Sequence, residues 1–324
     1  MKNLTDKYKM IAEDAASMFG RWDAGEGVFA RNLVTATIQE LFRYEYPETK
    51  WASGEMIDWV QGASDGASEI GYLQTGSVGG GEPGASAIVS HYATDIPEVD
   101  LNGDYHLTRV HTVACSFSYS TQEVRAARFQ NLFDIAQEKA RSAKEKHDRD
   151  INALIAFGSS AHGLEGVTNG TGISVLPAIT GNWATATPDQ IRADFAEAYQ
   201  SMIDATGGVE KPNMAVVSPG ILARLRSLLN SANASNISLK DYLEAAYEVT
   251  FHAEQTMTQA GPGSSNAMLL YRKDPQRVRV AMPLFLSPLP IQPVGLAFKC
   301  PMESRFGGVI LPRPLSIQIG RASC

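Results

Sequence analysis

The stretch Tyr119-Ser-Thr-Gln-Glu-Val-Arg-Ala-Ala127 marks the point at which the character of the chain changes. Ser120 and Glu123 match the S-x-x-E pattern of a capping box, so we predict that a helix begins here. Gly158 is the next signal that ends a helix. The expected helix therefore spans 121–157 and is about 55 Å long. Its apolar residues do not keep a heptad repeat, so a coiled coil is not expected.

Charge differs sharply on the two sides of this point. The segment from Trp51 to Thr108 has no Lys or Arg and nine acidic residues: Glu55, Asp58, Asp65, Glu69, Glu82, Asp95, Glu98, Asp100 and Asp104. The predicted helix is instead rich in basic residues: Arg125, Arg128, Lys139, Arg141, Lys144, Lys146 and Arg149. Charge patterning of this kind bears on partners more than on fold. We therefore expect the acidic segment of one copy to pair with a basic surface of another.

The acidic segment is predicted to form a long two-stranded excursion. Glu69–Gln74 reads as a strand, 76–84 as a glycine-rich tip and Ser86–Tyr92 as the returning strand. Asn102-Gly103 is a second turn signal. Tyr105–Tyr119 alternates along its length and is predicted to be one long strand. Because an isolated hairpin is marginal in water, this one needs a partner surface.

The first fifty residues read as an arm with two amphipathic helical pieces, Asp6–Phe19 and Ala30–Tyr44, the second ended by Pro47. Neither piece can bury its apolar side alone, so each needs a surface to lie on. The apolar residues expected to bind that surface are Leu33, Ile38, Leu41 and Phe42.

Helices and short strands alternate after the long helix. Thr187, Ser218 and Ser238 precede three predicted helices, 188–205, 220–229 and 239–247. The predicted strands are 214–217, 249–254, 267–271 and 278–281, followed by a strand-rich tail over 290–319. The segment 230–236 is a polar loop containing three asparagines.

Composition narrows the class of protein. The chain has 324 residues, of which 44% are hydrophobic and 19% charged, and typical soluble chains carry about 25% charged residues. A surface with few charges suits a subunit that buries much of itself against neighbours. The net charge of −7 argues against tight general binding to nucleic acid. No apolar run is long enough to span a membrane, and no apolar core of a signal peptide is present.

No group of residues requires catalytic chemistry or a cofactor. The glycine-rich 79–84 lacks the GK[ST] ending of a phosphate loop, and no CxxC motif occurs. His106 and His111 fall on opposite faces of a regular strand, so they cannot share a metal. His147 lies on the apolar stripe of the long helix and is interpreted as a hydrogen-bonded packing residue. A cytoplasmic enzyme is kept as the alternative from a different class.

The order of parts resembles that of the major capsid protein of tailed bacteriophages, whose fold is shared with encapsulin shells and the herpesvirus capsid floor. Three local stretches carry the resemblance. The stretch 119–127 is similar to the strand-to-spine-helix entry of that family, 163–169 to the turn after the spine, and 217–220 to a strand-to-helix step. The resemblance covers nearly the whole chain.

The resemblance implies an α+β fold with named parts. These are an N-terminal arm (1–60), an extended E-loop hairpin (61–104), a P-domain (105–187) with a spine helix over about 121–157, an A-domain (188–285) and P-domain return strands (286–324). It implies hexamers and pentamers of an icosahedral shell that encloses double-stranded DNA. The expected location is the virion capsid, after assembly in the host cytoplasm.

The resemblance also implies partners. The chain would bind itself, packaged DNA weakly and without specificity, and portal, scaffold and decoration proteins. An encapsulin-like compartment that holds protein cargo is the alternative. Some relatives cross-link through a Lys in the E-loop. No Lys occurs between Lys50 and Lys139 here, so non-covalent contacts are expected.

The assembly contacts expected from these observations fall into three sets. Acidic residues Glu69, Glu82, Asp95 and Glu98 would face basic residues Arg125, Arg128, Arg141, Lys144 and Arg149 of a neighbour. The apolar arm residues listed above form the second set, and the loop residues Asn230, Asn233 and Asn236 would point at the capsomer axis. An exposed ion pair contributes about 0–1 kcal/mol, whereas a fully buried apolar side chain contributes roughly 1.5–3 kcal/mol.

Overall fold

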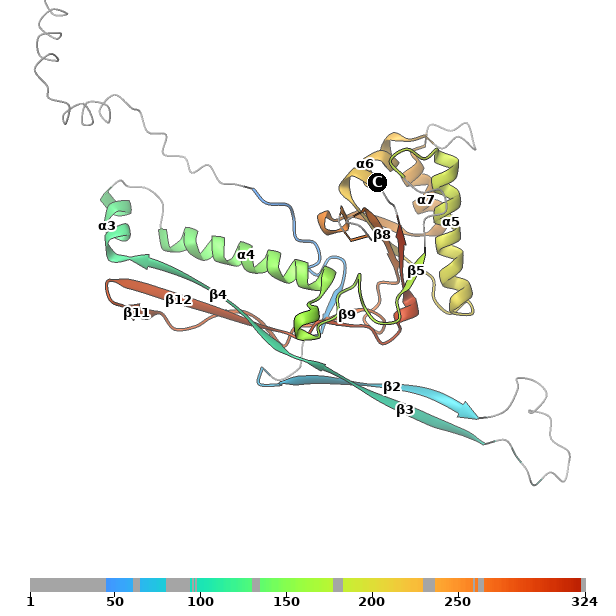
Figure 1. Cartoon of the computed structure of the whole chain (residues 1–324), viewed down its shortest axis with the longest axis horizontal. Coiled ribbons are helices and arrows are strands. Elements are labelled where there is room, and N and C mark those ends of the chain that lie inside the picture. Colours follow the sequence, from blue (N-terminus) through green and yellow to red (C-terminus); the bar gives the residue numbers. More distant parts are fainter. Residues whose placement is uncertain are drawn as a thin grey trace, which may run out of the picture. The chain divides into compact units, whose positions relative to one another are not determined.

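Figure 1 shows the computed structural model, an α+β chain as the sequence predicts. It describes residues 45–60, 65–79, 94, 96, 98–129, 135–176, 183–229, 237–258, 260, 261 and 265–321. From residue 46 onward these belong to one unit, Tyr46–Cys324. The predicted arm before residue 45, the glycine-rich tip, the predicted strand Ser86–Tyr92 and the polar loop 230–236 lie outside the described residues.

A five-stranded sheet forms the centre of the C-terminal half. Its strand order is β5 (Ser174–Leu176), β14 (Ile317–Arg321), β8 (Ala267–Tyr271), β6 (Met214–Val217) and β7 (Thr250–Ala253). Both faces of β6 and β8, two of the three inner strands, are buried, so they read as continuous apolar runs. Both were predicted correctly from those runs.

Each face of this sheet belongs to a different hydrophobic core. Because side chains alternate along a strand, Ala215 and Leu270 pack with α5 (Pro188–Ala205), α6 (Pro219–Ser227) and α7 (Leu239–Tyr247). Val216 and Leu269 pack on the opposite face with α4 (Ile135–Phe157) and with β9 (Arg279–Ala281) and β13 (Val309–Ile310). Strand β9 also pairs with β1 (Asp58–Val60). The two cores therefore share the strands between them.

Two of the three helices on the first face confirm the predicted caps, Thr187 and Ser238, whereas Ser218 before α6 makes no side-chain cap hydrogen bond. Thr187 and Gln190 form a complete capping box at the start of α5. The Ser238 hydroxyl accepts the backbone N–H of Asp241 at 3.1 Å at the start of α7. Pro219 is the first residue of α6. Local signals place these helices: the caps of α5 and α7 satisfy N–H groups that a helix start leaves unpaired, and Pro219 has no N–H to satisfy and a φ suited to the first helical position.

A second sheet is built on two long antiparallel strands. β4 (His111–Ser120) pairs along its whole length with β12 (Ala297–Phe306). The other edge of β12 pairs with β10 (Leu284–Pro288) and β11 (Gln292–Val294). Helix α4 lies alongside β4 (Figure 1). The C-terminal strand β12 thus pairs with a strand that lies nearly two hundred positions earlier in the chain.

The predicted single helix over 121–157 is wrong. The described residues form two helices, α3 (Thr121–Phe129) and α4, with 130–134 outside the described residues. The Lys139 ammonium contacts the Glu123 carboxylate at 2.9 Å, whereas sixteen residues of straight helix would separate them by about 24 Å. The chain therefore turns back between the two helices. Asp134 and Gln137 have the spacing of a second helix start, a signal that the prediction overlooked.

The predicted strands of the acidic segment are corrected in two respects. β2 (Glu69–Gly79) pairs with β3 (Val99–Arg109), so the returning strand is later than predicted and the hairpin extends beyond 104 to Arg109. Asn102-Gly103, predicted as a turn, lies inside β3 opposite Gly76 and Thr75. The predicted strand Tyr105–Tyr119 is divided at Val110, whose backbone N–H donates to the Ser68 carbonyl at 2.9 Å. Its two parts, β3 and β4, join different sheets.

The end of α4 is fixed by the turn that follows it. Gly158 has a φ of +64° and confirms the predicted helix end. The Asn169 amide donates to the Phe157 carbonyl, and its carbonyl oxygen accepts the Gly166 N–H, both at 2.7 Å. The first bond satisfies a carbonyl group that the helix end leaves unpaired, and the second fixes Gly166 of the following loop to the same side chain. The turn therefore anchors α4 against the core.

Candidate assembly surfaces

The β2–β3 hairpin has one apolar face that is exposed along its length. The register places Leu73 opposite Tyr105 and Gly71 opposite Leu107, and directly opposed residues lie on one face. The apolar hairpin face consists of Leu73, Val99, Leu101, Tyr105 and Leu107, which are 58–72% exposed. Contiguous exposed apolar residues usually mark an interaction surface.

The opposite face of the hairpin is polar and acidic. Strand alternation places Asp100, Asn102 and Asp104 there, with Val78 opposite Asp100. All three polar residues are exposed. Asp100 and Asp104 therefore lie on the face opposite to Leu101 and Tyr105, which the sequence pattern of the whole acidic segment does not reveal.

The predicted acidic contacts are only partly described. Glu69 is exposed at the start of β2 and lies opposite Arg109 in the register. Glu98 is exposed just before β3. Glu82 and Asp95 lie outside the described residues. Their pairing with a neighbouring copy stays a prediction.

The predicted basic contacts differ in how far they are already engaged. Arg125 on α3 and Lys144 on α4 are exposed. Arg141 pairs with Glu145 at 2.9 Å, and the Arg149 guanidinium lies 3.9 Å from the centre of the Tyr46 ring. The side chain of Arg128 is outside the described part. Arg125 and Lys144 are therefore better placed than Arg141 and Arg149 to meet an acidic partner.

The capping box at the start of α3 is present and carries an additional ion pair. The Ser120 N–H donates to the Glu123 carboxylate at 2.9 Å, and the Glu123 N–H donates to the Ser120 hydroxyl at 3.1 Å. Lys139 donates to the same carboxylate and to the Ser118 carbonyl. The hydrogen bond from Lys139, followed by that from Ser120, lowers the pKa of Glu123. These contacts fix α3 and α4 relative to the end of β4.

A second apolar surface was not found by sequence reasoning. Residues 280–298 include no Asp, Glu, Lys or Arg. Within them the β10–β12 tip exposes five apolar side chains: Phe285, Leu289, Ile291, Val294 and Leu296. Leu296 is 74% exposed although its backbone carbonyl accepts the Thr121 N–H. The absence of charge over 19 residues was the signal that could have identified this surface.

The remaining predicted contacts are not described. Leu33, Ile38, Leu41 and Phe42 of the arm, and Asn230, Asn233 and Asn236 of the polar loop, all lie outside the described residues. Their roles stay predictions.

The histidines show packing roles. His147 is 2% exposed, and its Nε2 lies 2.6 Å from the Ser304 hydroxyl, as predicted for a hydrogen-bonded packing residue. The interruption at Val110 changes the strand parity, so His106 and His111 line one cavity of about 900 Å³ together with His162. His106 nevertheless stacks on Tyr72, whereas His111 contacts His162 edge to face. Across the described part of the chain, no group of three His, Cys, Asp or Glu residues could hold a metal ion.

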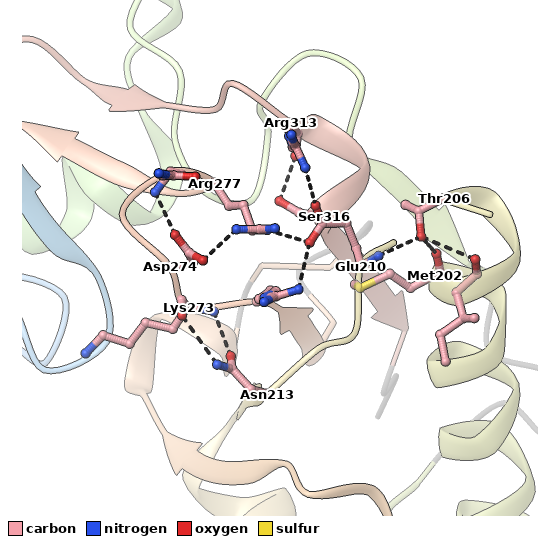
Figure 2. Close-up of polar contacts among 12 residues, drawn as sticks. Met202, Thr206, Glu210, Asn213, Lys273, Asp274, Arg277, Arg313 and Ser316 are labelled. Atoms are coloured by element: carbon pink, nitrogen blue, oxygen red, sulfur yellow. Dashed lines mark hydrogen bonds and ion pairs between the residues drawn. The ribbon is translucent and has the colours of Figure 1, made fainter. Parts of the chain in front are cut away.

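A buried carboxylate holds three loops together (Figure 2). Glu210 is 3% exposed and accepts Arg277 at 2.5 Å and Arg313 at 3.0 Å. Arg272 lies 3.5 Å away, and Arg277 also pairs with Asp274. The hydrogen bond to Glu210 is the main cause that raises the pKa of Arg277. The cluster joins the segments after α5, after β8 and after β13, so it is a structural anchor.

None of the described helices combines the length and the apolar character needed to cross a membrane. Together, the exposed apolar hairpin, the uncharged tip and the long α4 against β4 define a structural subunit of a larger assembly. Comparison with known proteins supports this class. A family model described as major capsid protein matches residues 84–319, so the chain belongs to the major capsid protein family. It is therefore a capsid protein, and its fold is that of a bacteriophage capsid structure.

Solved structures show the same fold at low sequence identity. The capsid of Myoviridae phage XM1 matches with a TM-score of 0.77 at 17% identity, over 90% of this chain and 97% of that chain. The capsid of an empty GTA particle matches with a TM-score of 0.59 at 15% identity, over 93% and 98%. The virus-like particle of Pyrococcus furiosus matches with a TM-score of 0.53 at 14% identity, over 82% and 91%. A search of curated proteins returned no match.

Proposed function

We propose that the chain assembles as hexamers and pentamers of an icosahedral shell around double-stranded DNA, in the cytoplasm of the host. In this proposal the arm is 1–60 and the E-loop is the β2–β3 hairpin with its connecting residues. The P-domain combines the remainder of 105–187 with 286–324, and the A-domain is 188–285. Portal, scaffold and decoration proteins would be further partners of the shell.

The observation that carries the proposal is the exposure of the apolar hairpin face. Five large apolar side chains on one face are 58–72% exposed in the single chain. Burying each of them contributes roughly 1.5–3 kcal/mol. The apolar side chains of the hairpin are thus removed from water only when another surface covers them. A second copy of the chain provides such surfaces in every position of a closed shell.

Charge has a smaller part in this proposal. Glu98 and the acidic hairpin face would meet exposed basic residues such as Arg125 and Lys144 of a neighbour. Each exposed pair contributes about 0–1 kcal/mol and is screened by salt. Weak contacts suffice because the shell repeats each of them, and weak contacts allow misplaced subunits to dissociate during assembly.

The shell would be held by non-covalent contacts. The E-loop region contains no Lys, since none occurs between Lys50 and Lys139. An isopeptide bond formed by an E-loop amine therefore lacks its nucleophile. Denaturing gel electrophoresis of purified particles tests this directly: a ladder of covalent multimers of the 35.0 kDa chain would contradict it.

Substitution on the hairpin tests the assembly role. Leu101→Asp and Tyr105→Asp place charges on the apolar hairpin face, so we expect folded subunits that do not form particles. Val78→Asp is the matched control, because Val78 is 56% exposed on the opposite face of the same hairpin. Sedimentation velocity and negative-stain microscopy measure the particles. Equal assembly of all three variants would reject the proposed contact.

The charge contribution is tested separately by salt and by charge reversal. We expect assembly of the wild type to weaken as salt rises, and Glu82, Asp95 and Glu98 changed together to Lys to assemble less well at low salt. Assembly that is insensitive to salt in both proteins would reject the charge contribution while leaving the apolar contact in place.

The contents of the particle distinguish DNA from protein cargo. The structural likeness to a virus-like particle keeps the encapsulin-like alternative open. We expect purified particles to contain double-stranded DNA. A protein cargo without nucleic acid, found by absorbance and mass spectrometry, would favour the alternative.

A further inference from the structure

The segment 49–60, which precedes the β2–β3 hairpin in the chain, is built into the core of the subunit. Its side chains Trp51, Met56 and Ile57 are at most 1% exposed. They pack in the core that also contains residues of α4, β8 and β9. The segment is therefore part of the folded core, although the resemblance assigns it to the arm.

The first half of the segment is tied to α4 and to the short helix η3 (Gln255–Thr258). The N–H groups of Trp51 and Ala52 donate to the Asn152 side-chain oxygen on α4, at 3.0 and 3.3 Å. The Trp51 indole N–H donates to the Thr256 hydroxyl on η3 at 3.0 Å. A buried donor that loses its acceptor costs free energy, so these bonds specify where the segment lies.

The second half of the segment is tied to strands of two sheets. The Met56 carbonyl accepts the Tyr271 hydroxyl of β8 at 2.8 Å. Residues 58–60 form β1, which pairs in parallel with β9. The Trp59 ring lies edge to face against Phe285 of β10, with 5.7 Å between the ring centroids. This one segment therefore contacts both of the regions proposed as P-domain and A-domain.

The residues directly before the segment are held in a different way. Residues 45–48 are exposed and form no helix or strand. The Arg149 guanidinium lies 3.9 Å from the centre of the Tyr46 ring, and the Lys50 ammonium lies 3.9 Å from the Glu48 carboxylate. Contacts of these kinds are weak where solvent reaches them. The boundary between the two compact units of the chain falls at the same place, after residue 45.

We propose that 49–60 is a strap that fastens the core of the subunit, and that the arm pivots at 45–48. A hinge consists of a few loop residues that absorb changes of backbone angle, as 45–48 can, whereas bending within the strap would expose Trp51. The arm could then turn toward a neighbour while the core keeps its packing. That use of the pivot rests on the proposed shell, but the strap and the pivot belong to the single subunit.

Hydrogen exchange of the full chain, followed by mass spectrometry, tests the position of the pivot. Peptides that cover 49–60 should exchange about tenfold or more slowly than peptides that cover 45–48, because local opening is rarest where the chain is buried. Limited proteolysis of the native chain should likewise cut at 45–48 before it cuts within 49–60. Equal exchange in the two sets of peptides, or equally fast cleavage of the two segments, would overturn the proposal.

Substitution in η3 tests the strap itself. Thr256→Val keeps the shape of the side chain but removes the acceptor of the Trp51 indole N–H, so exchange of 49–60 should become about tenfold faster. Peptides from α5 should be unaffected. Thr258→Val is the matched control, because Thr258 belongs to the same helix and makes no side-chain hydrogen bond to 49–60 within the described residues. Equal protection of 49–60 in both variants would overturn the strap.

Substitution at the pivot separates it from the strap. Tyr46→Ala removes the contact with Arg149, and we expect it to leave the exchange of 49–60 unchanged. Faster exchange throughout 49–60 in this variant would overturn the pivot, because the fastening would then begin before residue 49. None of these experiments measures particle formation, so a failure of the proposed shell would leave their outcomes unchanged.

Discussion

At the scale of single residues, two glycines at the end of α4 share a backbone angle but not their surroundings. Gly158 and Gly163 have φ values of +64° and +65°. A Cβ at Gly158 would lie 2.3 Å from the Leu164 carbonyl oxygen and 2.7 Å from the Gly166 nitrogen, whereas one at Gly163 meets nothing within 4 Å. The positive φ favours glycine at both positions, but only at Gly158 does close packing also exclude a Cβ.

This difference predicts unequal costs of substitution by alanine. Gly163→Ala should lower the free energy of unfolding by about 1–2 kcal/mol, the cost of a left-handed angle. Gly158→Ala should cost clearly more, because the turn must also move away from the helix end. Urea unfolding of both variants measures the difference. Equal losses of unfolding free energy in the two variants would show that the turn can move away from a Cβ at Gly158 at no cost in free energy.

Burial of His252 makes the stability of the fold depend on pH. Burial lowers the pKa of His252, although Glu55 at 3.5 Å acts in the other direction. The folded chain resists protonation that the unfolded chain accepts below about 6.5. His252 therefore contributes stability above that pH, and the contribution is lost as pH falls through the lowered pKa.

We accordingly expect His252→Gln to flatten the decline of stability between pH 7 and pH 5. Urea unfolding of the wild type and the variant at several pH values gives the comparison. The other titratable groups are present in both proteins, so their contributions cancel to first order. A decline of the same slope in both proteins would exclude His252 as its source.

At the scale of elements, the sequence predicts what local chemistry determines. Helices α5, α6 and α7 and the C-terminal end of α4 follow from local signals at Thr187, Pro219, Ser238 and Gly158. Strands β6 and β8 follow from uninterrupted apolar runs. These predictions need no knowledge of distant residues.

Elements defined by distant partners were predicted less well. The pairing of β2 with β3 depends on register across a long connection, and the Asn102-Gly103 pair gave a misleading turn signal. The division into α3 and α4 depends on Lys139 reaching Glu123 and Ser118. The two candidate surfaces were missed for the same reason. Which face of the hairpin is apolar depends on the register of β2 with β3. The position of the β10–β12 tip depends on the pairing of β12 with β4.

At the scale of the whole molecule, the unit 46–324 is connected through the strands that its two cores share. β6 and β8 contribute alternate side chains to both cores, and the Glu210 cluster joins three of the loops at their ends. Neither core can lose its packing without exposing the back of the same sheet. We therefore expect the regions proposed as P-domain and A-domain to unfold as one cooperative unit.

This arrangement predicts a single thermal transition for the free subunit. Calorimetry should give a van't Hoff enthalpy equal to the calorimetric enthalpy, as for a two-state protein. Two resolved peaks would show that the halves melt independently. A single transition would mean that each subunit changes its position during shell formation as one rigid body. The shared strands β6 and β8 leave no boundary between the two cores at which it could bend.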